Sequence, residues 1–464
     1  MTRLRGLKGA PTGFRRLAAA MILAAVPGVP SASASESFPE ELPVAQSLAG
    51  NYLAARAAGT ARDARGAAAY FGRALELDPG NPDLLRNAFL SMIAKGSYDQ
   101  AMDYAAELIV SEPSNRFARY ALAMRDIKRR QYGGVERHLT AVRPGTLADL
   151  TAGIVLAWAQ HGAGRTDAAV ATIDGLSGPE WYDLFKHYHR GLILSAAGNP
   201  AEAGPELEAA YRMDPGILRI VQARARFEAR NGNTDDALDI LNAYENTVPG
   251  HPEIAILREE IESGQTVAPH IASPDRGAAE VFQGLGIALS RDGGEDQGVL
   301  YLRIALYGAE DDTLAMAALA DIYERLGKYS DAIAVYDNIP DTAAVRRSAD
   351  VKLALNLDAL DRTDEAIAIL NRHMETDPRD LEALVALGNI FRARERFDEA
   401  AETYARAIDQ ITIPEPRHWT LYYYRGIAYE RAKRWPLAET DLQTALELFP
   451  DHPLVLNYLG YSWI

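Results

Sequence analysis

Two histidines lie close together in the sequence, His187 and His189, and paired imidazoles are common metal ligands. On a helix, residues two apart point about 200° away from each other, so they cannot share one ion as residues four apart can. Paired carboxylates such as Asp311 and Asp312 fall in segments typical of turns and helix caps, where aspartate serves the backbone. These side chains therefore predict no metal site.

Motifs for nucleophilic or phosphate chemistry are incomplete. The sequence contains no H-E-x-x-H, no G-x-x-x-x-G-K and no full G-x-G-x-x-G after a strand. Gly460, Tyr461 and Ser462 begin a pattern that lacks the second glycine of a nucleophile elbow. The chain has no cysteine, which excludes disulfides, thiol nucleophiles and thiolate metal sites. We therefore expect no cofactor.

A repeat of 34 residues organises the elements that carry these side chains. Residues 419–452 place large, small and proline residues at positions 4, 8, 11, 20, 24, 27 and 32 of such a frame, namely Tyr422, Gly426, Tyr429, Ala438, Leu442, Ala445 and Pro450. The same frame starts again at 279, 313, 347 and 381, and an earlier set starts at 48, 82, 116, 149, 184 and 218. A period of this length predicts stacked helical units.

At these positions the chain resembles the tetratricopeptide repeat family. The resemblance implies an all-α fold, an α-solenoid of antiparallel helix pairs wound into a right-handed superhelix. The small residue at position 8 allows the two helices of a pair to approach closely, and Gly286 holds that position in its repeat. Glycines such as Gly96 and Gly327 are predicted to end first helices in a left-handed conformation. Asp99, and the residues at the same position of later repeats, are predicted to cap the second helices.

The first 34 residues predict a cleavable secretion signal. A basic start without acids comes first, with Arg3, Arg5, Lys8, Arg15 and Arg16. It is followed by an apolar run, residues 17–26, and then by the small-x-small site Ala32-Ser33-Ala34. Ten apolar residues are too few for a membrane-spanning helix, which takes about 20. An uncleaved anchor or a disordered tail is the alternative. The signal implies a periplasmic location in a Gram-negative bacterium.

The repeats predict the following organisation: signal peptide, 1–34; N-terminal segment, 35–47; a first block of about six repeats, 48–251; a degenerate repeat and linker, 252–278; and a second block of five repeats plus a truncated one, 279–464. Pro269, Pro274 and Gly264 prevent one helix from crossing the linker. A long loop packed on a continuous solenoid is the alternative. Because the last repeat stops after its first helix at Ile464, we expect the sequence to be a fragment of a longer protein. The alternative is that this last helix serves as a cap.

The family resemblance implies that positions 2, 5, 9 and 12 of each repeat line a concave surface that binds peptide segments. The candidates for peptide binding are Gln222, Arg226, Gln283, Asp321, Glu324, Asn389, Arg392, Tyr423 and Glu430. An asparagine at position 9, such as Asn389, offers both a donor and an acceptor to a peptide backbone. The lysine that carboxylate-clamp members have at position 5 is replaced by Val385 in the same repeat.

Composition limits the partners. The net charge is −16 and becomes more negative on loss of the basic signal, which disfavours nucleic acid and anionic membrane surfaces. No stretch outside the repeats is large enough for a catalytic domain. We therefore expect a non-enzymatic scaffold or adaptor of the bacterial cell envelope that binds proteins or peptides. The alternatives are an assembly factor of an outer-membrane or secretion complex, and the repeat part of a protein with a catalytic domain after residue 464.

Overall fold

The computed structural model describes residues 46–291 and 293–462, and the side chains of residues 461 and 462 are excluded from the description. Every regular element in these ranges is helical, which confirms the predicted all-α repeat fold. The predicted signal peptide and most of the segment 35–47 lie outside the described residues. By their contacts the described residues form two compact units, one that ends at Leu319 (unit 1) and one that begins at Ala320 (unit 2).

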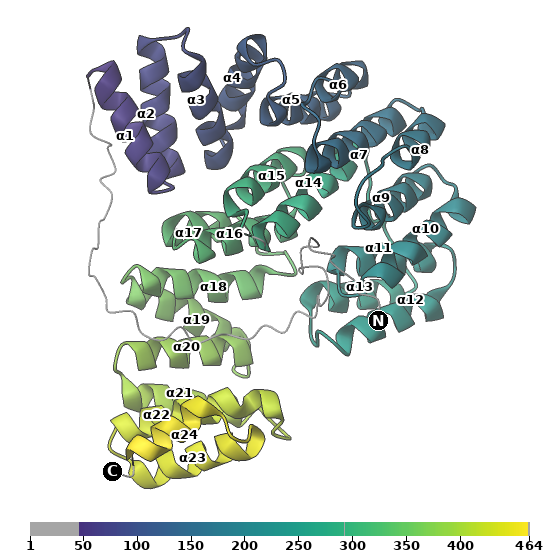
Figure 1. Ribbon diagram of the computed structural model, residues 1–464. Coiled ribbons are helices and arrows are strands. Elements are labelled where there is room, and N and C mark those ends of the chain that lie inside the picture. Colours follow the sequence, from purple (N-terminus) through teal and green to yellow (C-terminus); the bar gives the residue numbers. More distant parts are fainter. Residues whose placement is uncertain (1–45, 292, 463–464) are drawn as a thin grey trace, which may run out of the picture. The chain divides into compact units, whose positions relative to one another are not determined.

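Unit 1 begins with six antiparallel helix pairs (Figure 1). The first helices of the pairs are α1 (Leu48–Thr60), α3 (Pro82–Lys95), α5 (Arg116–Lys128), α7 (Thr146–Gly162), α9 (Tyr182–Ala196) and α11 (Leu218–Arg230). The second helices are α2 (Ala64–Leu77), α4 (Tyr98–Ser111), α6 (Tyr132–Leu139), α8 (Thr166–Asp174), α10 (Pro200–Met213) and α12 (Thr234–Glu245). They are followed by α13 (Pro252–Glu262), α14 (Pro274–Arg291) and α15 (Glu295–Gly308).

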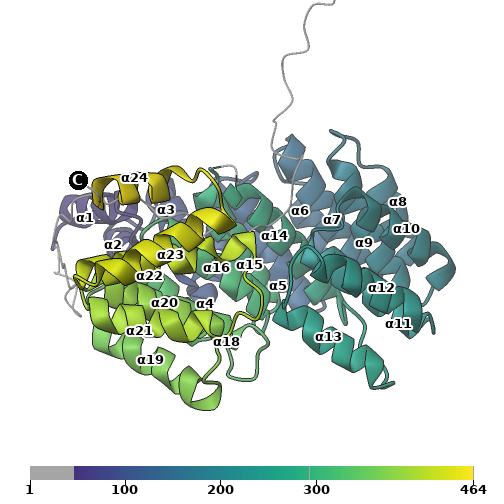
Figure 2. The same cartoon turned by 90° about the horizontal axis from the view of Figure 1, so that it is seen from below.

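Unit 2 continues the helix pairs, and each helix packs on its neighbours in chain order (Figure 2). Its first helices are α18 (Arg346–Ala359), α20 (Leu381–Ala393), α22 (Trp419–Arg431) and α24 (Pro453–Ser462). The boundary between the units along the chain lies within α16 (Thr313–Arg325), whose C-terminal part belongs to unit 2. The second helices are α17 (Tyr329–Asp337), α19 (Thr363–Thr376), α21 (Phe397–Ile408) and α23 (Trp435–Leu448), and a short 3₁₀ helix, η1 (Pro416–His418), precedes α22.

Close approach of paired helices explains the small residues of the repeat. A β-carbon at Gly388 of α20 would lie 2.7 Å from the ring of Tyr404 on α21, and one at Gly286 would lie 3.1 Å from Leu302. The alanine at position 20 is fully buried in the second helices of unit 2, as in Ala332 and Ala400. The spacing in the sequence is therefore the spacing of helix crossings.

The turns between paired helices agree with one prediction and correct another. Gly96 and Gly327 have φ values of +86° and +70°, so they end their helices in the left-handed conformation as predicted. Asp99, however, does not cap α4: it lies inside the first turn, and the N-cap is Ser97 without a side-chain hydrogen bond. The aspartate at this position instead places its charge near the positive end of the helix dipole.

The two units defined by helix packing differ from the two blocks of repeats predicted from the sequence. The register predicts a boundary at the linker 252–278, whereas the contacts place the boundary inside α16. The cause is the position of α14 and α15, which follow the linker but pack against the helices that precede it. No helix of the described residues is long and apolar enough to cross a membrane.

Candidate binding surfaces on the first helices

The first helices of unit 1 are covered by a segment of the same unit. α14 packs against α5, α7 and α9, and α15 packs against α3 and α5, all of them first helices (Figure 1). We call α14 and α15 the internal hairpin. The surface that corresponds to the concave face of the predicted solenoid is therefore filled between α3 and α9.

Aromatic side chains seal the contact between the internal hairpin and α5. The ring of Tyr120 lies 5.6 Å from Phe282 on α14 and 6.1 Å from Tyr301 on α15, in edge-to-face geometry. The hydroxyl groups of Tyr301 and Thr151 are 3.1 Å apart, so the buried tyrosine has a polar partner. Burial raises the pKa of Tyr301, which keeps its hydroxyl neutral. This part of the surface is therefore a packed core and not an open groove.

Three predicted binding residues lie inside unit 1. Gln222 is buried and donates to Glu253, and Gln283 is buried on α14 with its amide directed at Asp312. Arg226 is half-buried and forms an ion pair of 2.7 Å with Glu260. These side chains hold neighbouring helices of the same unit together. Their role in peptide binding stays a prediction.

In unit 2 the predicted residues of α16 meet polar side chains of α18. Asp321 accepts hydrogen bonds from Lys352 and, at 2.7 Å, from the hydroxyl of Tyr336. Glu324 accepts from the amide of Asn356. Burial raises the pKa of Glu324, although Lys352 lies near and opposes this change. The first helices α16 and α18 thus present a row of paired donors and acceptors.

Asn389 and Arg392 of α20 come together with two tyrosines. The hydroxyl of Tyr404 donates to Oδ1 of Asn389 at 2.8 Å, which orients the amide and leaves Nδ2 as the group that can donate to a ligand. The guanidinium of Arg392 lies 4.5 Å from the centre of the Tyr424 ring, a cation–π geometry. Burial raises the pKa of Tyr404 to about 12, so its hydroxyl stays a donor at neutral pH.

Tyr423 and Glu430 of α22 face α24. Tyr423 is 9% exposed and packs edge-on against Tyr458 with ring centres 6.1 Å apart. The hydroxyl of Tyr458 donates to Glu430 at 2.9 Å. We call the surface of α16, α18, α20, α22 and α24 that carries these contacts the unit-2 face, defined by Asp321, Glu324, Lys352, Asn356, Asn389, Arg392, Tyr423, Tyr424, Glu430 and Tyr458.

Four members of this face, Lys352, Asn356, Tyr424 and Tyr458, were not among the candidates predicted from the sequence, and three of them share one position in the repeat. Lys352, Tyr424 and Tyr458 all occupy position 6 of their repeats, and each reaches a polar side chain at position 9 or 12 of the preceding repeat. The signal was present in the sequence as a recurring long or aromatic residue at position 6. It was overlooked because only positions 2, 5, 9 and 12 were taken as concave.

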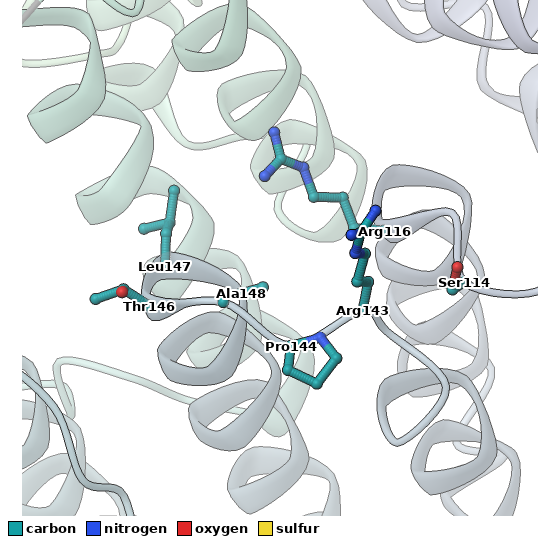
Figure 3. A pocket seen from close by; sticks show the side chains of 8 residues that line it. Ser114, Arg116, Arg143, Pro144, Thr146, Leu147 and Ala148 are labelled. Carbon is teal, nitrogen blue, oxygen red and sulfur yellow. The ribbon is translucent and has the colours of Figure 1, made fainter.

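A separate open pocket of about 370 Å³ lies in unit 1 between the turns that precede α5 and α7 (Figure 3). Arg116 and Arg143 line it, with Thr146 at the start of α7. Arg116 also lies over the ring of Phe117, 5.0 Å from its centre, and Arg143 is exposed. The pocket is therefore a positively charged hollow at the surface.

The close histidine pair has structural partners. His189 is buried and accepts a hydrogen bond of 3.2 Å from the indole of Trp158, and His187 lies 2.6 Å from Glu206. Burial lowers the pKa of His189 to about 4, so this imidazole is neutral. Across the described part of the chain, no group of three or more histidine, aspartate or glutamate side chains is arranged to hold a metal ion.

The family models for the tetratricopeptide repeat match residues 49–127, 194–261, 315–341, 351–412 and 419–452. Together these ranges cover more than half of the sequence. The chain belongs to the tetratricopeptide repeat family. No curated protein matches it at a significant level.

Several solved tetratricopeptide repeat structures are similar to the chain. YrrB, a protein "with an unusual peptide-binding site", is 21% identical, with 39% of this chain and 92% of YrrB covered and a TM-score of 0.30. MamA from Desulfovibrio magneticus RS-1 is 18% identical over 38% of this chain and 97% of its own, with a TM-score of 0.33. The Cut9–Hcn1 complex gives 14% identity, 90% coverage of both chains and a TM-score of 0.35. Identities and TM-scores this low carry no conclusion about the function of this chain.

Proposed function

We propose that this tetratricopeptide repeat protein is a non-catalytic scaffold that holds a partner protein through a segment bound on the unit-2 face. The observation that carries the proposal is the difference between the two sets of first helices. Those of unit 1 from α3 to α9 are covered by the internal hairpin, whereas the main packing within unit 2 joins helices that are neighbours in the stack. Among the described residues, the unit-2 face is thus a row of first helices that no hairpin of the same unit covers.

The chemistry of the face suits an extended peptide. Its centre combines an amide at Asn389, a guanidinium at Arg392 and the aromatic ring of Tyr424, three kinds of group that are common in protein interfaces. The paired donors and acceptors are held in place before a ligand arrives, which lowers the ordering cost of binding. A peptide carbonyl would accept from Nδ2 of Asn389, and a peptide carboxylate or carbonyl would accept from Arg392.

We further propose that the protein works in the periplasm of a Gram-negative bacterium. The basic start, the apolar run and the small-x-small site in residues 1–34 support export. The negative charge of the rest of the chain supports a protein partner rather than nucleic acid. N-terminal sequencing of the protein from a periplasmic fraction tests this point, and an intact Met1 on protein from the cytoplasm would overturn it.

Site-specific photo-crosslinking in cells tests the binding face. One full-length variant carries benzoylphenylalanine in place of Val385, a half-buried residue at position 5 of the repeat that contains α20, and a matched variant carries it in place of Arg372, an exposed residue on the second helix α19. We expect a discrete crosslinked partner from position 385 and none from position 372. Equal products from both positions, or none from either, would refute the unit-2 face as the binding surface.

A further inference from the structure

The internal hairpin is recognised by unit 1 through a buried ion pair. Glu280 on α14 is 4% exposed, and Arg219 on α11 donates to both of its carboxylate oxygens, with Nε at 3.0 and 3.1 Å. The hydroxyl of Tyr188 on α9 donates to the same carboxylate at 2.7 Å. Two first helices of the solenoid therefore converge on one side chain of the hairpin.

Further titratable groups near this pair include His270, Asp312, His189 and Arg226. His270 of the linker lies 3.1 Å from the Tyr188 hydroxyl, and burial and the nearby Arg219 lower its pKa, so the imidazole is neutral. Burial raises the pKa of Asp312, which is directed at Gln283 and lies in the field of Arg219. Burial would raise the pKa of Glu280, but the charge and hydrogen bonds of Arg219 outweigh it and lower this pKa to about 2. The carboxylate is thus held charged.

Shape complementarity fixes the hairpin on either side of the ion pair. Gly277, one turn before Glu280, lies under the indole of Trp158, where a β-carbon would be 2.3 Å from the ring. Gly308 at the end of α15 lies against Met124, where a β-carbon would be 2.8 Å from the sulfur. Phe282 fills the space beside Tyr120. α14 thus presents a small residue, a carboxylate three residues later and an aromatic residue two further on to α5, α7, α9 and α11 together.

The arrangement of α14 agrees with this role. Residues 277–283 are all buried, so the helix lacks the exposed polar stripe of a surface helix. An unpaired charge in such a place is very costly, whereas a paired one mainly selects a single arrangement. A wrong helix, or the right helix moved by one turn, would leave the guanidinium of Arg219 buried without its carboxylate.

We propose that the first helices of unit 1 form a receptor groove for a helix, that its resident ligand is the chain's own α14, and that Glu280 is the residue that selects this ligand. The groove excludes ordinary peptides as long as α14 is bound. An external helix could enter only by presenting a carboxylate to Arg219 and Tyr188 with a small residue over Trp158. This inference does not depend on the unit-2 face.

Hydrogen exchange on the full chain tests the selection. Glu280→Gln keeps the shape of the side chain and removes its charge, and we expect amides of α14 to exchange on the order of a hundredfold faster than in the wild type. The control is Glu310→Gln, which removes an exposed ion pair with Lys128 near the end of the same hairpin and should leave α14 unchanged. Exchange of α14 that is as slow in Glu280→Gln as in the wild type would overturn the proposal.

A labelled peptide of residues 274–291 measures whether the groove can be filled from outside. We expect no anisotropy change with wild-type chain, binding to the Glu280→Gln chain, and at least about tenfold weaker binding of the peptide that itself carries Glu280→Gln, since it lacks the charge for Arg219. Equal binding of the peptide to wild type and variant, or equal binding of the two peptides, contradicts selection by Glu280.

A double variant covers the case in which Glu280→Gln fails to fold. Arg219→Met with Glu280→Gln removes both charges, so no guanidinium is left unpaired in the interior. We expect this chain to fold and to regain slow exchange in α14. A double variant that exchanges as fast as Glu280→Gln, or that also fails to fold, would show that the pair does not determine the docking of the hairpin.

Discussion

The indole of Trp158 on α7 lies against the backbone of Gly277 on α14, so close that a β-carbon at residue 277 would stand 2.3 Å from the ring. Trp158 is fully buried and is also fixed by its hydrogen bond to His189. The ring therefore cannot turn away cheaply, and the contact has no room for a methyl group.

Gly277→Ala should lower the stability of unit 1 despite the better helix propensity of alanine. Overpacking of a rigid core costs roughly 1–3 kcal/mol, more than the 0.5–1 kcal/mol that alanine contributes over glycine in a helix. Gly59→Ala in α1, where a β-carbon meets no atom within 4 Å, should raise the stability instead. Urea unfolding of both variants measures the two effects, and effects of the same sign would contradict the close contact.

Gly388→Ala should destabilise unit 2 for a related reason. The added carbon would lie 2.7 Å from the ring of Tyr404, which is itself fully buried and donates a hydrogen bond to Asn389. We expect a loss of about 1–3 kcal/mol. Gly460→Ala in α24, which has open space around it, serves as control and should not destabilise the fold. Thermal unfolding followed by circular dichroism compares the two.

Acid should weaken the docking of the internal hairpin. The pKa of Glu280 is lowered to about 2 in the folded chain from an ordinary value of 4.5, so its contribution to stability is complete above pH 4.5 and is lost as the pH falls toward 2. The stability difference between wild type and Glu280→Gln should therefore shrink over this window. Carboxylates far from residue 280 titrate equally in both chains and cancel. A difference that stays constant from pH 5 to pH 2 would disagree with the ion pair.

Arg392→Ala should weaken partner capture more than it weakens the fold. The cation–π contact with Tyr424 contributes only about 0.5–1 kcal/mol to stability at a partly exposed site, so the melting temperature should fall little. The yield of the product crosslinked from position 385 should fall severalfold. Arg372→Ala, on the second helix α19, should leave both the melting temperature and the crosslinking yield unchanged. An unchanged yield in Arg392→Ala would remove this side chain from the proposed binding face.

The helix pairs could be predicted from the sequence because their determinants are local. Gly286, Gly388 and the alanines opposite them recur at a fixed spacing, and close helix crossing is the direct consequence of their size. The cap predicted at Asp99 was wrong by two residues, because an aspartate that follows a turn suits both the N-cap and the first helical turn. Propensity alone does not separate the two places.

The packing of the internal hairpin on the first helices of unit 1 could not be predicted from the repeat. Arg219 and Glu280 are 61 residues apart and occupy different repeats, and no period connects them. Gln222 and Gln283 were expected on an open concave surface, yet both are buried. One signal was available: residues 277–286 contain a single charged side chain, and a helix without a charged face is expected to be enclosed.

The internal hairpin gives the N-terminal repeats a fixed number. It contacts α3, α5, α7, α9 and α11, and each of these helices packs against a different part of the hairpin, whose length is fixed. A solenoid normally tolerates the gain or loss of a unit, since each unit contacts only its neighbours. Here the insertion or deletion of one repeat would move Arg219 away from Glu280 by a whole helix pair. The internal hairpin therefore fixes the number of repeats that precede it.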